Sequence, residues 1–143
     1  MPSPDDIGLP PRAASTGDLI EAGGDRAAPD QGAMRAAVSN AMVGLKKEFY
    51  GKGPVAAKTY FEDDYVFVVL EGGLTRNEET LLAAGETQLV REYRLRFQEA
   101  VTRTICSAVE EIVGRRVLTY HSQIVFDPVR TFEIFVLEPE RDR

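Results

Sequence analysis

Lysines and glycines around positions 46 to 58 form the part of this chain best suited to binding a small ligand. All its lysines lie there, around the segment Gly51-Lys52-Gly53-Pro54. Glycines let backbone amides approach a ligand closely, and clustered ammonium groups attract an anion such as phosphate or bicarbonate. The alternative is a glycine that ends a helix beside a solvated basic patch. The candidate anion-binding residues are Lys46, Gly51, Lys52, Gly53 and Lys58.

Other residue types give weaker signals for chemistry. The spacing of the glycines and Lys52 is not that of a nucleotide-binding P-loop. His121 and Cys106 are the only histidine and the only cysteine, so an internal disulfide and a Cys/His metal cage are both excluded. The pair Asp63-Asp64 is typical of a turn, because acid-base work needs a shielded pocket. We therefore expect no catalytic residue, metal or cofactor, and the pattern favours a binding module over an enzyme.

Charge is distributed unevenly along the 143 residues, which carry 23 acidic and 17 basic side chains and a net charge of −6. Most of the excess acid lies in residues 1–33, which also lack aromatic residues and regular periodicity. Such a segment cannot bury enough apolar surface to offset the entropy of ordering it. The composition predicts a disordered acidic tail over 1–33, a single α+β domain over 34–139 and a short charged end over 140–143.

Hydropathy and charge together indicate the location and exclude some partners. The longest apolar run, 65–70, is far shorter than the roughly twenty residues of a membrane-spanning helix and also too short for a signal peptide. With a single cysteine, a reducing cytoplasm is the expected location. Because the net charge repels a phosphate backbone, nucleic acid is an unlikely partner.

The elements that must position these residues follow from periodicity and from helix-end signals. Apolar residues at helical spacing predict two main helices, strands are predicted from alternation, and Thr75-Arg76-Asn77-Glu78 fits a capping box that starts a short helix. Helices are expected over 34–49, 76–84 and 86–113, and strands over 57–61, 65–71, 117–126 and 131–137. The order α-β-β-α-α-β-β predicts an α+β fold: an antiparallel four-stranded sheet of two hairpins with helices mainly on one face.

The second hairpin presents two faces in this prediction. One face is expected in the core and contains Leu118, Tyr120, Ile124, Phe126, Phe132, Ile134 and Val136. The other is half apolar, which is more than a solvated face requires. A second copy of the chain is the simplest cover, since most soluble oligomers are symmetric homo-oligomers; the alternative is a monomer with scattered surface apolar residues. The candidate interface residues are Val117, Thr119, His121, Gln123, Val125, Phe135 and Leu137.

Several short segments resemble one small bacterial family. They are Val38-Ser39-Asn40-Ala41, 47–54 with its Tyr-Gly-Lys-Gly-Pro motif, 66–75 with its Leu-Glu-Gly-Gly-Leu-Thr motif, Phe126-Asp127-Pro128 and 135–139. Over about residues 34–139 the chain is similar to the MpsC-type family, a bacterial domain of unknown function named for a proposed sodium-translocating, membrane-potential-generating system. The genes of that system are associated with uptake of dissolved inorganic carbon. The resemblance brings no catalytic residue with it.

The expected function combines these observations. A chain without a spanning segment cannot itself carry ions across a bilayer, so the resemblance implies an accessory role. We expect a non-catalytic, cytoplasmic interaction module, dimeric, linked to an inorganic-carbon or cation transport system, with a membrane protein or another protein as partner. One alternative is a sensor of a small anion, or a cryptic enzyme, that uses the lysine loop. Another is weak RNA binding by the arginine-rich helix over 86–113.

Overall fold

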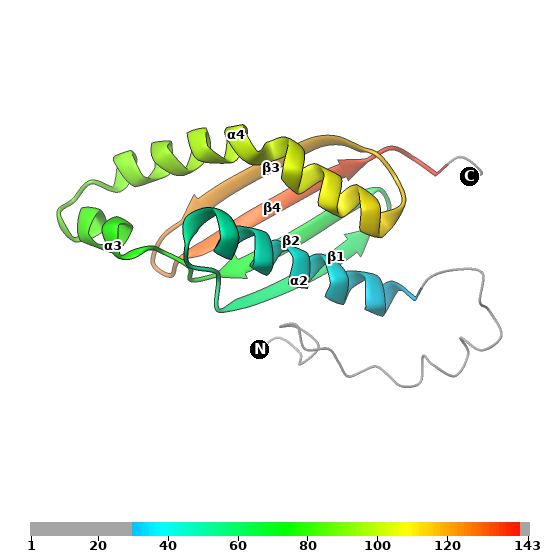
Figure 1. Ribbon diagram of the computed structural model, residues 1–143, viewed down its shortest axis with the longest axis horizontal. Helices are drawn as coiled ribbons and strands as arrows, with labels where there is room; N and C mark the ends of the chain where they lie inside the picture. The colour runs from blue at the N-terminus through cyan, green and yellow to red at the C-terminus, as the bar shows by residue number, and fades with distance from the viewer. Residues whose placement is uncertain (1–29, 141–143) are drawn as a thin grey trace.

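Residues 30–140 are described by the computed structural model, and their helices and strands follow the order α-β-β-α-α-β-β (Figure 1). This order confirms the predicted fold class. The predicted tail, apart from its last residues, and the predicted charged end, apart from Glu140, lie outside the described residues. The elements are α2 (Gln31–Tyr50), β1 (Ala56–Glu62), β2 (Tyr65–Glu71), α3 (Arg76–Ala83), α4 (Thr87–Val113), β3 (Val117–Val125) and β4 (Arg130–Leu137).

The four strands form one antiparallel sheet in the order β1-β2-β4-β3. Each hairpin supplies one inner strand, so β2 pairs with β4 at the centre and β1 and β3 are the edges. Helices α2 and α4 both lie across the same face of this sheet (Figure 1). The opposite face, which we call the open face, has no helix of the described chain over it.

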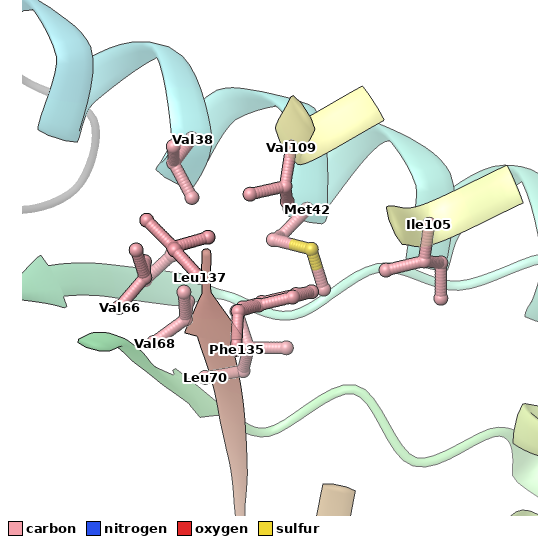
Figure 2. Close-up of a cluster of buried hydrophobic side chains, with 10 residues drawn as sticks. Val38, Met42, Val66, Val68, Leu70, Ile105, Val109, Phe135 and Leu137 are labelled. Atoms are coloured by element: carbon pink, nitrogen blue, oxygen red, sulfur yellow. The ribbon is translucent and has the colours of Figure 1, made fainter. Parts of the chain in front are cut away.

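The core lies between the two long helices and the sheet. Val38 and Met42 of α2 and Ile105 and Val109 of α4 point toward the inner strands (Figure 2). The strand side chains that meet them are Ala57, Val66, Val68, Leu70, Phe135 and Leu137. These strand positions alternate along each strand, as expected when one face of an antiparallel sheet is buried.

Helix ends follow the predicted signals, with one shift. Gly51 and Gly114 end α2 and α4 in the left-handed conformation, and Thr75 and Glu78 form the capping box at α3. Helix α2 begins at Gln31 rather than at Met34, because the Asp30 carboxylate accepts a hydrogen bond from the Gly32 amide at 3.1 Å. The last residues of the predicted tail therefore belong to the first helix.

The predicted face assignment of β4 was wrong. Phe135 and Leu137 are buried in the core, while Phe132 lies on the open face. The cause is Glu133, which shares the helix-covered face with Phe135 although a charged residue normally indicates solvent. In β3 a register shift between Val117 and Thr119 also turns Val117 toward the core.

The predicted interface set is therefore divided by the sheet. Val117, Phe135 and Leu137 are unavailable to a partner on the open face, because they pack within the core. The rest of the set, Thr119, His121, Gln123 and Val125, shares the open face with Phe132, Ile134 and Val136, as their cross-strand pairing requires. Ile134 and Val136 were predicted as core residues and are instead half-buried on that face.

Within residues 30–140, no helix combines the length and apolar character needed to cross a bilayer.

The two phenylalanines of β4 provide a test of this face assignment. Phe135 is 0% exposed and Phe132 is 40% exposed. Replacing Phe135 by Ala removes a fully packed ring and is expected to lower the free energy of unfolding by about 3–5 kcal/mol. Phe132→Ala is the matched control and should cost less than about 1.5 kcal/mol. Equal losses for both variants in urea unfolding would contradict the assignment.

Candidate functional site

The lysines and glycines of the predicted anion site occupy different environments. Lys46 is buried under α2 and pairs with Glu133, whereas Lys52 is exposed in the loop after the helix. Lys58 lies on the open face, with its Nζ 5.4 Å from the centre of the Tyr60 ring. The sheet therefore separates Lys46 from Lys58, and these lysines do not converge on one point.

The glycines of this loop have structural reasons for their identity. Gly51 adopts a φ of 83°, which ends the helix. A Cβ on Gly53 would lie 3.1 Å from the Lys47 Cβ and 3.2 Å from the Val43 carbonyl oxygen, so a side chain there would press against the end of α2. Both observations favour helix termination over a built anion site at this loop.

A buried carboxylate lies at the centre of the helix-covered face. Glu133 of β4 accepts hydrogen bonds from the Tyr120 hydroxyl and from Ser122 Oγ, the latter at 3.1 Å. Lys46 Nζ of α2 lies 2.9 Å from Glu133 Oε2. Burial, together with the neighbouring Glu133 carboxylate, raises the pKa of Tyr120, so this phenol stays protonated and donates its hydrogen. Three donors thus satisfy one fully buried acid.

A second buried ion pair joins α4 to α3. Arg94 Nε and Nη2 each lie 2.6 Å from a carboxylate oxygen of Glu78, in a bidentate arrangement. The Nη2 group also donates to the Gly73 carbonyl oxygen at 3.1 Å, and the guanidinium carbon lies 4.1 Å from the centre of the Tyr50 ring. One side chain therefore connects four segments of the chain.

The surroundings of Arg94 fix the protonation of its neighbours. Burial alone would raise the pKa of Glu78, but the hydrogen bonds and charge of Arg94, with those from Thr75, outweigh it, and the pKa is lowered. Burial raises the pKa of Tyr50 to about 12 despite the opposing charge of Arg94. Near neutral pH, Glu78 is therefore an anion and Tyr50 is a neutral hydroxyl that can donate.

The two loops that carry the family-like motifs meet beside this ion pair. A Cβ added to Gly73, whose φ is 92°, would lie 3.3 Å from both the backbone nitrogen and the Cα of Pro54. The Val55 amide donates to the Glu71 carbonyl oxygen at 2.9 Å, which fixes the same contact. The second glycine of the Gly-Gly pair is thus required by close backbone packing, in addition to ending the strand.

A pocket of about 440 Å³ lies between α4, the β3–β4 hairpin and the carboxyl end of α2. Both ion pairs contribute to its wall through Lys46 and Arg94. Leu95 and Ile124 supply apolar surface. The remaining lining residues are polar or aromatic: Tyr50, Gln88, Arg91, Glu92, Gln98, Ser122, Gln123 and Thr131. A size of this order suits a small organic molecule.

Residues that could support other chemistry lie apart from this pocket or are engaged elsewhere. Burial, with the nearby Glu110 charge, raises the pKa of Cys106 and keeps it a thiol. His121 lies on the open face, 3.3 Å from the Thr119 hydroxyl. Among residues 30–140, no three His, Cys, Asp or Glu side chains lie close enough to hold a metal ion. The arrangement therefore supports binding of a molecule through hydrogen bonds and charge.

The sequence predictions missed most of this site. Of the residues around it, only Lys46 was proposed as a ligand-binding group. Glu78 was recognised as a helix-capping residue and Arg94 as part of a basic stripe, but their ion pair was not expected. A charged residue within an alternating apolar strand, as at Glu133, was the one available signal of a buried polar group.

Removing Lys46, the cation that pairs with the buried Glu133 carboxylate, is expected to destabilise the fold. Lys46→Met keeps the aliphatic stem but leaves Glu133 without its cation, and should lower the free energy of unfolding by about 3–5 kcal/mol. Lys47→Met, on the exposed side of the same helix turn, is the control and should change it by less than about 0.5 kcal/mol. Chemical denaturation measures both. If Lys46→Met lowers the free energy of unfolding as little as the control does, the expectation that Lys46 compensates the buried charge of Glu133 is wrong.

The Arg94–Glu78 pair predicts a specific acid sensitivity. Because the pKa of folded Glu78 is below its ordinary value of 4.5, the unfolded chain binds more protons between those two values. The pair's stabilisation is therefore complete above the ordinary value and is lost as pH falls through the lowered pKa. The stability difference between wild type and Glu78→Gln should shrink from about pH 7 to about pH 3. A constant difference for Glu78→Gln would refute the expectation.

Comparison with known proteins places the chain in a family. It is 24% identical over 95 residues to the uncharacterized protein YbcI of Bacillus subtilis (strain 168), which covers 66% of this chain and 77% of YbcI. No solved structure matches it. The model of the family described as "Na+-translocating membrane potential-generating system (MpsC)" matches residues 30–139, which include both ion pairs, the pocket and the open face. The chain therefore belongs to the MpsC family.

Proposed function

We propose that this protein is a non-catalytic interaction module that forms a homodimer through the open face of its sheet. The observation that carries the proposal is a group of four aromatic side chains on that face, 37% to 47% exposed: Tyr60, Tyr65, Phe67 and Phe132. Contiguous apolar surface on a soluble protein is typical of a binding site. Since both long helices pack on the other face, nothing in the described chain covers this one.

The strand register supports the proposal, because it gives the open face the layout of an interface. One cross-strand row runs Tyr60, Phe67, Ile134, His121. The rows on either side are Glu62, Tyr65, Val136, Thr119 and Lys58, Val69, Phe132, Gln123. In each row the two central strands contribute apolar side chains, and polar or charged residues lie mainly on the edge strands. An apolar centre with a polar rim is the usual anatomy of a protein interface.

A second copy of the same chain fits this face better than an unrelated partner whose surface carries charges of one sign only. The rim combines Lys58 and Glu62 on β1 with the Glu71–Arg130 ion pair at 3.7 Å. A two-fold interface places the same patch against itself, so a rim with both signs can pair with its own copy. Two sheets can then pack face to face about 10 Å apart.

The proposal also includes the cellular role. The description of the family, a sodium-translocating system that generates a membrane potential, supports an accessory role beside a membrane-embedded cation transporter. The described chain has no helix able to span a bilayer, so the translocating part would be a separate membrane protein. The resemblance noted above extends this role to inorganic-carbon uptake.

The alternative functions receive less support from the geometry. An anion sensor at the lysine loop would need lysines that converge, and they do not. RNA binding would need a continuous basic stripe, but Arg94 is buried against Glu78 and Arg96 lies 3.9 Å from Glu92.

Light scattering across a concentration series tests the proposed dimer. Wild-type protein should be a dimer at micromolar concentration, and Phe132→Glu, which places a charge in the apolar centre, should weaken dimerisation at least about 30-fold. Leu89→Glu is the matched control, since Leu89 is an exposed apolar residue of α4 on the other side of the molecule. Circular dichroism verifies that both variants fold. A wild-type monomer throughout, or equal effects of the two substitutions, would overturn the proposal.

A further inference from the structure

The pocket beside α4 is lined by two largely buried polar residues whose side chains have no hydrogen-bond partner in the described part of the chain. Gln98 is only 7% exposed and Thr131 only 6% exposed, and both residues line the pocket. Among residues 30–140, neither the Gln98 amide nor the Thr131 hydroxyl forms a hydrogen bond; Gln98 contributes its backbone oxygen, which accepts from Thr102 Oγ1 at 2.8 Å. Both residues face the pocket without a protein partner, so their amide and hydroxyl are available to a polar ligand bound there.

The charges around the pocket leave one cation without a matching acid. Lys46 pairs with Glu133, Arg94 pairs with Glu78, and Glu92 lies within ion-pair distance of Arg96. Arg91 instead donates to the neutral Gln88 side chain at 3.2 Å and lies 5.3 Å from the centre of the Phe126 ring. It forms no ion pair within the described part of the chain. The pocket therefore carries an excess of about one positive charge.

Hydrogen-bonding capacity in the pocket also favours donors. The Nη1 group of Arg94 is used neither by Glu78 nor by Gly73, and the Lys46 ammonium has more hydrogens than its bond to Glu133 requires. Tyr50 remains a neutral hydroxyl because burial raises its pKa to about 12. A ligand that matches this inventory is rich in acceptors.

Size and wall chemistry separate an organic acid from an inorganic ion. The volume of about 440 Å³ far exceeds a single small anion, and Leu95 and Ile124 offer apolar contact that an inorganic ion cannot use. A multiply charged anion would also face the acids that already balance Lys46 and Arg94.

We propose that this pocket binds a small organic carboxylate carrying a single negative charge. The Gln98 amide and Thr131 hydroxyl supply hydrogen bonds, Arg91 supplies the balancing charge, and Leu95 and Ile124 contact the apolar part of the ligand. Of the residues that line the pocket, only Gln123 also belongs to the open face, so ligand binding and dimerisation can be tested separately.

Paired probes that differ only in charge test the ligand class. Titration of ¹⁵N-labelled full-length protein with benzoate and with hexanoate, followed by NMR, should give saturable shifts at Gln98 and Ser122 and their neighbours. Benzamide and hexanamide, which have nearly the same shape but no charge, should bind at least about tenfold more weakly. Absence of saturable binding by both carboxylates, equal binding by the amides, or tighter binding of inorganic phosphate would each overturn the proposal.

Matched variants test the location. Arg91→Gln should weaken binding of the carboxylate probe at least about tenfold, and Gln98→Leu should also weaken it. Arg103→Gln removes an exposed arginine of the same helix that does not line the pocket, and should leave binding unchanged. Unaltered binding in Arg91→Gln and Gln98→Leu, or the same loss in all three, would refute the site. Light scattering on the same samples reports the dimer separately, so failure of one proposal is distinguishable from failure of the other.

Discussion

Burial of the Glu133 carboxylate is the constraint on which the arrangement of this protein depends. A charged group on an inner strand, without contact with water, requires donors from the elements around it. They come from α2, through Lys46, and from β3, through Tyr120 and Ser122. These contacts demand that α2 lie across the sheet far enough to reach β4, and that β3 keep the register that turns Tyr120 and Ser122 toward the helices. The contacts of Glu133 thus tie α2, β3 and β4 to one another.

The long helix α4 divides into two parts with different roles. Ile105 and Val109, toward its carboxyl end, pack in the core. Toward its amino end, Arg91, Arg94 and Gln98 line the pocket. The Arg94–Glu78 pair, with its bond to Gly73, holds this second part against α3 and the loop after β2. One amphipathic helix therefore both completes the core and forms a wall of the polar pocket, because the pocket-lining polar residues lie near its amino end and Ile105 and Val109 lie near its carboxyl end.

Local signals in the sequence predicted most of the fold. The capping box at Thr75, the terminal glycines at Gly51 and Gly114 and the order of the elements all depend on neighbouring residues, and each is confirmed. The site depends instead on contacts between distant residues, such as Lys46 with Glu133. Nothing in a single sequence indicates such a contact. Proximity in the chain was also misleading: Lys46 and Lys58 are close in sequence, but the sheet lies between them.

The sheet order β1-β2-β4-β3 has a consequence for the way this domain is synthesised. Strand β4 is the last of the four to be made, yet it lies between β2 and β3 and carries both Phe135 and Glu133. Until it leaves the ribosome, the first hairpin, which is marginal alone, is the only part of the sheet on which the helices can pack. One edge of the apolar strand β2 is then unpaired, which makes it a template for wrong pairing. Pairing of β2 with β4 spans more than half of the described chain, so the sheet is completed late and through a long-range contact.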